Sequence, residues 1–214
     1  MSCEFLLQCH HYFLMPSFEE VCIKLLRRPG WAPKVLLGGA LSFLPVLNLF
    51  SLGYLLHYTI RLNRTSDWNL PDWSESNALD LFKSGLNLFI LLIFYVGIPI
   101  AVGLLLSIII NGITFGVFGI LIYFPTAVGA FVAPFLFLAS VQAYIRDGLL
   151  RDAFQLNLVV KISKAMGVNL ILPVVSFWGI LLLALPLYGF SFFLGTWILL
   201  AYSSALNFSI NNKK

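Results

Sequence analysis

The sequence predicts an all-α, polytopic helical membrane protein, because long stretches of the chain are apolar and carry no charge. Residues 84–145 contain no Asp, Glu, Lys or Arg, and neither do residues 165–212. A third uncharged run, residues 35–60, includes His57. A transmembrane helix needs about 20 apolar residues, so each longer run accommodates about two spans. We therefore expect four transmembrane helices, one re-entrant or Pro-broken membrane element and short interfacial helices.

The composition agrees with this fold class. Hydrophobic residues make up 60% of the chain and charged residues 10%, and the mean hydropathy is +0.93. In soluble proteins about 45–50% of residues are hydrophobic and about 25% are charged. The apolar runs are continuous rather than alternating, which indicates helices. We expect one membrane domain over residues 15–214. The net charge of +4 reflects basic residues beside anionic lipid head groups, not nucleic-acid binding.

Residues 1–14 differ in character from the rest of the chain. They lack the basic region and cleavage site of a signal peptide, and they are too short and too polar to span a membrane. We expect them to be unstructured or to precede a true start at Met15. Cys3, Cys9, His10 and His11 lie here. Zinc sites need four ligands at defined spacing, so we predict no metal site.

A short helix is predicted over residues 18–28. Ser17 is a typical N-cap, and Glu19 and Glu20 suit the first turn. Val21, Leu25 and Leu26 form an apolar stripe along the segment, opposed by the basic residues Lys24, Arg27 and Arg28. This pattern predicts an amphipathic helix on the membrane surface, which Pro29-Gly30 ends. Trp31 and Lys34 then suit the interface.

Residues 35–60 carry helix-breaking residues near their middle, namely Gly38-Gly39, Pro45 and Asn48. Proline removes a backbone donor and bends a helix. Two interpretations stay open at this point. One is a single kinked span, and the other is a re-entrant hairpin of two short arms that turns near Pro45–Asn48.

The expected transmembrane helices are residues 85–110, 113–141, 168–187 and 190–207. Their internal turns, around Asn111-Gly112 and Tyr188-Gly189, carry no charge. Every Lys and Arg lies in the N-terminal segment or in residues 61–83, 146–164 and 213–214. A re-entrant first element puts all these segments on one side, as the positive-inside rule favours. Both termini are then cytoplasmic.

Two polar segments connect the membrane elements. In Arg64–Ser84 we expect a solvated loop with tryptophans at head-group level, followed by a helical turn near Asn77. Its acids lack the register of a calcium-binding loop. Residues 146–166 contain two i, i+4 apolar rows and are expected to form a helix packed on two sides. The rows are Leu150, Phe154, Leu158 and Ile162, and Leu149, Ala153, Leu156 and Val160.

The expected spans lack the groups that catalysis requires. Residues 85–141 and 168–207 contain no acidic, basic or His side chain. Hydroxyls inside membranes more often bond helix carbonyls or a neighbouring helix than attack a substrate. We expect His57 to extend toward the cytoplasmic interface. We therefore predict no catalytic, cofactor-binding or metal-ligating residue, and a protein that is not an enzyme. A series of small residues predicts close helix packing: Gly112, Gly116, Gly119, Gly129 and Ala133.

Several short stretches, taken in order, resemble a known family. They are Arg28-x-x-Trp31, Leu36–Ala40, Pro45–Asn48, Leu52–Leu55, Leu70-Pro71-x-Trp73, Leu81-Phe82-x-x-Gly85 and the segment Gly148–Ile162. Their combination, over about residues 18–207, resembles the prokaryotic membrane family known as domain of unknown function 4013. The resemblance implies residence in a prokaryotic cytoplasmic membrane, and it implies no activity, substrate or catalytic residue.

The function expected from the sequence is that of a non-catalytic scaffold or accessory protein. It would act through lipid contacts, a second copy of the chain or a membrane-protein partner. The alternative is a transporter or pore for a neutral or lipidic substrate, because a broken helix such as residues 35–60 is typical of transport sites.

Overall fold

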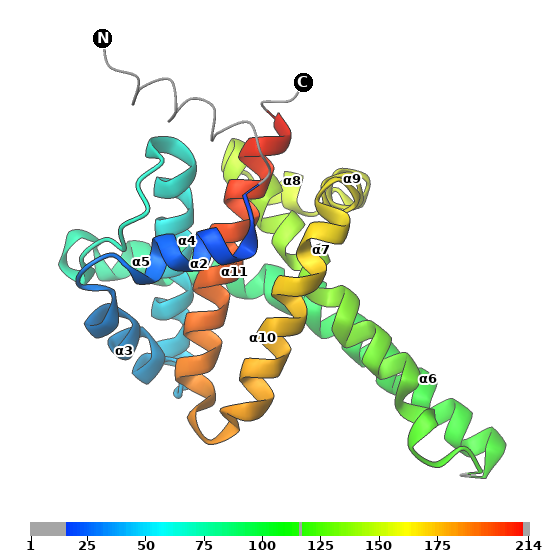
Figure 1. Cartoon of the computed structure of the whole chain (residues 1–214). Helices are drawn as coiled ribbons and strands as arrows, with labels where there is room; N and C mark the ends of the chain where they lie inside the picture. Colours follow the sequence, from blue (N-terminus) through cyan, green and yellow to red (C-terminus); the bar gives the residue numbers. More distant parts are fainter. Residues whose placement is uncertain (1–15, 116, 212–214) are drawn as a thin grey trace. The chain divides into compact units, whose positions relative to one another are not determined.

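The computed structural model describes residues 16–115 and 117–211, and every regular element in this part of the chain is a helix. Four helical stretches are long and apolar enough to cross a membrane: Ala78–Thr114, Gly119–Asp147, Leu156–Leu183 and Leu185–Ile210. They correspond to the four predicted spans. The chain divides into two compact units, Asn87–Gly167 and the segments on either side of it (Figure 1).

The first unit contains the N-terminal helices and the C-terminal hairpin. Its elements are α2 (Phe18–Leu26), α3 (Trp31–Leu41), α4 (Pro45–Thr65), the 3-10 turn η1 (Trp73–Glu75), the first part of α5 (Ala78–Leu92), α10 (Ile171–Leu183), the turn η5 (Leu185–Leu187) and α11 (Tyr188–Asn211). Helix α11 is the central element of this unit, because it contacts α2, α3, α4 and α10 and most of its apolar stretch is buried.

Helix α2 begins where the sequence predicts. The Ser17 side chain accepts from Glu20 N at 3.1 Å, and Glu20 Oε2 accepts from Ser17 N at 3.2 Å, which forms a capping box. Val21 and Leu25 are buried. Helix α2 packs on α11, so protein rather than lipid covers these two residues of the predicted apolar stripe.

Helices α3 and α4 form a hairpin beside α11 (Figure 1). Trp31 lies 6.3 Å from Trp197 between ring centroids, and Phe43, past the end of α3, lies 4.9 Å from Tyr188. Helix α3 therefore runs antiparallel to α11, and its end reaches the level where α11 begins. Helix α4 then returns, and Asn63 Nδ2 donates to Ser204 Oγ at 2.9 Å.

The break within residues 35–60 differs in detail from the prediction. The chain turns at residues 42–44, where Ser42 N bonds back to Gly38 O and Gly39 O. Pro45 does not kink a helix. It occupies the first turn of α4, where a backbone N–H would have no partner within the helix.

Helices α4 and α5 cross at two glycines. A Cβ on Gly53 would collide with Leu81 O, and a Cβ on Gly85 would collide with Leu49 O. The two glycines therefore let the helix backbones touch: Gly53 packs on the carbonyl one turn before Gly85, and Gly85 packs on the carbonyl one turn before Gly53. Asn77 caps α5 through a bond from Leu79 N to Oδ1 at 3.3 Å, close to the predicted start of this helix.

The second unit contains the end of α5, the π-helical segment η2 (Ile93–Gly97), α6 (Ile98–Thr114), η3 (Gly119–Tyr123), α7 (Phe124–Asp147), α8 (Leu150–Ala153) and α9 (Leu156–Met166). Helices α6 and α7 form the long green hairpin of Figure 1. They repeat the glycine arrangement, with Gly103 against Pro125 O and Gly129 against Pro99 O. Ser107 Oγ and Thr126 Oγ1 lie 2.9 Å apart across the same contact.

Three local predictions were wrong. Asn111 and Gly112 lie inside α6, and turn residues follow at Phe115, Val117 and Phe118. Tyr188 and Gly189 are the first residues of α11, and the turn lies before them, at η5 (Leu185–Leu187). Residues 146–166 do not form one helix, since the chain breaks at Phe154-Gln155 between α8 and α9.

The predicted small-residue packing holds for Gly129, while Cβ atoms on Gly112 and Gly119 would meet nothing within 4 Å. Ala133 is fully buried in α7. Gly116 lies outside the described residues.

Candidate functional site

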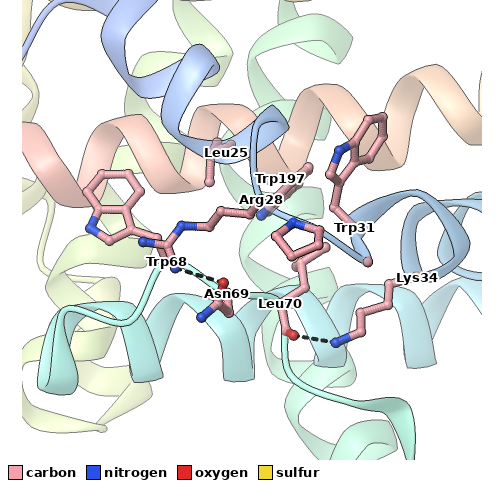
Figure 2. Close-up of a pocket in the computed structure, with 10 residues that line it drawn as sticks. Leu25, Arg28, Trp31, Lys34, Trp68, Asn69, Leu70 and Trp197 are labelled. Carbon is pink, nitrogen blue, oxygen red and sulfur yellow. Dashed lines mark hydrogen bonds between the residues drawn. The ribbon is translucent and has the colours of Figure 1, made fainter.

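The most distinctive site is a cavity of about 280 Å³ in the first unit (Figure 2). Three segments that are far apart in the sequence line it: the joint between α2 and α3, the loop after α4, and the middle of α11. The lining residues are Leu25, Arg28, Pro29, Gly30, Trp31, Lys34, Trp68, Asn69, Leu70 and Trp197.

The joint between α2 and α3 is fixed by local geometry. Gly30 has a left-handed backbone (φ 79°), which glycine adopts without the Cβ penalty of other residues. It is the N-cap of α3, and no side chain caps this end. The Trp31 Nε1–H donates to Leu26 O at 2.8 Å and holds the indole over the joint.

The loop after α4 is held in place by α4 itself. The Tyr54 hydroxyl donates to Pro71 O at 2.7 Å, and the Tyr54 ring stacks on Trp73 with centroids 4.0 Å apart. Within the loop, Asn69 N donates to Asp67 Oδ1 at 3.0 Å. Trp68 and Leu70 are thereby presented to the cavity.

Two cations reach into the cavity, and its described lining includes no carboxylate. Arg28 Nη1 donates to Asn69 Oδ1 at 2.7 Å and lies 3.9 Å from Asp67 Oδ1. Lys34 Nζ donates to Leu70 O and to Asp72 Oδ1, both at 2.7 Å. Figure 2 shows the Arg28 and Lys34 bonds to the loop as dashed lines.

A third cation lies near the cavity. Lys24 Nζ is 4.1 Å from the centroid of the Trp68 ring, a cation–π contact. Burial, together with the neighbouring positive charge of Arg28, lowers the pKa of Lys24. Three cations thus lie around the tryptophan-rich cavity, and Asp67 and Asp72 pair with two of them, Arg28 and Lys34.

The wall formed by α11 contains a buried donor. Trp197 is 1% exposed, and its Nε1 has no hydrogen-bond partner among the described residues. The Tyr58 hydroxyl, on the ring that meets Trp197 edge-on, lies near this N–H, so the two buried polar groups interact with one another behind the cavity wall.

His57 does not extend freely toward an interface. Its Nδ1 lies 3.3 Å from Ser76 Oγ and its Nε2 lies 2.9 Å from Ser84 Oγ. These contacts connect α4 to the loop before α5 and to α5 itself. The arrangement places a histidine beside two hydroxyls, a pairing that the sequence analysis missed because the three residues are up to 27 positions apart.

Several hydroxyls of the apolar helices bond helix carbonyls or a neighbouring helix, as predicted. Ser107 Oγ donates to Gly103 O at 2.9 Å and Thr114 Oγ1 to Ile110 O at 2.7 Å. Metal ligands do not gather in the described residues, where no three His, Cys, Asp or Glu side chains come together. Cys3, Cys9, His10 and His11 lie outside this part of the chain.

Comparison with known families decides the assignment. The model of a family described as "protein of unknown function (DUF4013)" matches residues 37–201, well over half of the chain. The chain belongs to the DUF4013 family. This confirms the resemblance, although α2 lies before the matched residues. No curated protein and no solved structure matches the chain.

The DUF4013 match covers only part of the cavity. Trp68, Asn69, Leu70 and Trp197 lie inside the matched residues, whereas Arg28 and the other lining residues up to Lys34 precede them. The cations of the cavity are thus supplied by the segment in front of the matched region.

Proposed function

We propose that this DUF4013 protein is a non-catalytic, multi-pass protein of a prokaryotic cytoplasmic membrane that acts through lipid or protein contacts. Its four long apolar helices and its family support membrane residence. A second copy of the chain or another membrane protein is a possible partner, and the exposed apolar faces of α6 and α7 provide surface for either. The protein would then act by binding lipids or other proteins in the membrane rather than by catalysis.

The observation that carries the membrane arrangement is the pairing of charges in the first unit. Arg28 and Lys34, which precede the α3–α4 hairpin, bond directly to the loop that follows it. Two segments in contact lie on the same side of a membrane. Helix α3 has 11 residues, about 16 Å at 1.5 Å per residue, whereas the hydrocarbon core is about 30 Å thick. The contact and the short first arm support a re-entrant hairpin, but its second arm, α4, has 21 residues and is not the short arm expected from the sequence.

With a re-entrant hairpin and four spans, both termini lie in the cytoplasm. The charged loops then lie inside, and the uncharged turns between α6 and η3 and between α10 and α11 lie outside, in agreement with the positive-inside rule. Helix α2 lies at the cytoplasmic interface, where its exposed Ile23 and Leu26 can reach the head-group layer.

Cysteine labelling tests this arrangement. In a background without native cysteines, single cysteines at the exposed positions Glu19, Ser74 and Lys164 should react with an impermeant maleimide only in inside-out vesicles. Cysteines at Val117 and Leu185 should react only from the periplasmic side. Labelling of Glu19→Cys and Ser74→Cys from opposite sides would contradict the re-entrant hairpin.

Transport of a neutral or lipidic substrate is the second candidate. Its support is the interruption of two membrane elements, at residues 42–44 and at the π-helical η2, since broken helices build transport sites. Reconstitution into liposomes with a panel of neutral and lipidic solutes tests it. Protein-dependent flux would replace the scaffold proposal.

A further inference from the structure

The cavity beside Trp197 has the chemistry of a phosphate site. Arginine offers five N–H donors, and the contacts of Arg28 within the described residues use Nη1, which leaves Nε and Nη2. Lys34 has three donors and uses two of them. The start of α3, where Pro33 has no N–H, adds the backbone N–H groups of Trp31 and Ala32 at the positive end of the helix dipole, without a side-chain cap.

The surroundings of the cavity favour an anion that carries acyl chains. Three of the lining residues are tryptophans, which are typical of the membrane interface. Leu37 follows Lys34 by three residues and so lies on the same side of α3, and it is 47% exposed. An exposed apolar side chain therefore follows the Lys34 cation along α3, toward the α3–α4 turn.

We propose that this cavity binds the phosphate head group of an anionic phospholipid, with Arg28 and Lys34 on the phosphate and Leu37 beside the acyl chains. The inference rests on the proposed function: it names the class of lipid that the protein contacts and the site of that contact. The tryptophan rings of the lining enclose the head group.

Thermal unfolding of the full chain in a neutral detergent tests the proposal, because a ligand that binds the folded state raises Tm. The probes are short-chain phosphatidylglycerol, short-chain phosphatidylcholine and inorganic phosphate. Phosphatidylglycerol should raise Tm more than phosphatidylcholine, and phosphate alone should not reproduce the rise. Arg28→Gln and Lys34→Gln should each weaken apparent phosphatidylglycerol affinity by about fivefold. The matched control Arg27→Gln removes an exposed charge outside the lining and should leave the affinity unchanged.

Several outcomes would overturn the proposal. Equal shifts with both lipids would show that the site does not select an anion, and a full shift with phosphate alone would show a site for a free anion. Retained selectivity in both cavity variants would place the lipid elsewhere.

A measurement on the unmodified protein guards against variants that do not fold. In nanodiscs of mixed lipid, bromine carried on the anionic lipid should quench tryptophan fluorescence more than the same amount on the zwitterionic lipid. Equal quenching would overturn the proposal. The cysteine labelling is independent of lipid selectivity, so failure here with correct labelling would overturn the lipid site alone.

Discussion

The Gly53–Gly85 crossing of α4 and α5 gives a sharp test of how the first unit is packed. Gly53→Ala adds a Cβ that would meet the Leu81 carbonyl oxygen, and this is a backbone atom that cannot rotate away. The two helices must therefore separate. Overpacking costs about 1–3 kcal/mol, and we take the upper end because backbone must move. Alanine returns about 1 kcal/mol of helix propensity. The net expected loss is about 2 kcal/mol.

A matched control exists within the same unit. Gly179 lies inside α10, and a Cβ there would meet nothing within 4 Å. Gly179→Ala should therefore leave stability unchanged or raise it by up to about 1 kcal/mol. The two variants make the same chemical change in a helix, so their difference isolates the crossing.

The assay is unfolding by SDS in mixed micelles, followed by circular dichroism. For a chain of this size a loss of about 2 kcal/mol corresponds to roughly 4–8 °C in Tm, which thermal unfolding would also detect. Gly85→Ala should behave like Gly53→Ala, and the double variant should cost less than the sum because the helices have already separated. Equal stability of Gly53→Ala and Gly179→Ala would refute the close crossing.

Three further predictions concern other parts of the chain. Pro45→Ala should change the free energy of unfolding by less than about 1 kcal/mol, because Pro45 lies in the first turn of α4 and interrupts no hydrogen bond within the helix. A larger loss in SDS unfolding would contradict this position. Tyr95→Phe removes a 2.6 Å bond to Ala153 O and should cost about 1 kcal/mol in the same assay, whereas no loss would argue against the contact. Burial raises the pKa of Cys22, so its thiolate forms at higher pH than usual and maleimide labelling near pH 7 should be slower than at an exposed cysteine placed at Glu19. Equal labelling rates would contradict it.

The spans were predictable from the sequence because apolar runs of this length have few alternatives to helix in a membrane. Their turns were not, and Asn111-Gly112 illustrates the reason. In water this pair is a turn signal, but in lipid an unpaired backbone group is costly, so α6 continues through it to Thr114. Glycine is also common inside transmembrane helices.

The cavity was not predictable because its parts are distant in sequence. Arg28, Trp31 and Lys34 each suited the interface singly, and no pattern related them to Trp68 or to Trp197 in the middle of an apolar run. The acids of the loop were expected to be solvated, yet Asp67 pairs with Arg61 at 2.9 Å. Only the fold brings these residues together. The unusual density of tryptophan beside basic residues was the one signal available.

The π-helical segment η2 makes the packing of α6 depend on residue count. A π-turn amounts to one extra residue within a helix, and each residue of an α-helix turns the chain by about 100°. Deleting one residue within Ile93–Gly97 while the helix stays continuous would rotate Gly103 and Ser107 by that angle, away from α7. The reciprocal glycine contact and the Ser107–Thr126 bond would both be lost without any change to the residues that make them. The number of residues in η2 therefore decides which face of α6 meets α7, as much as the side chains at the contact do.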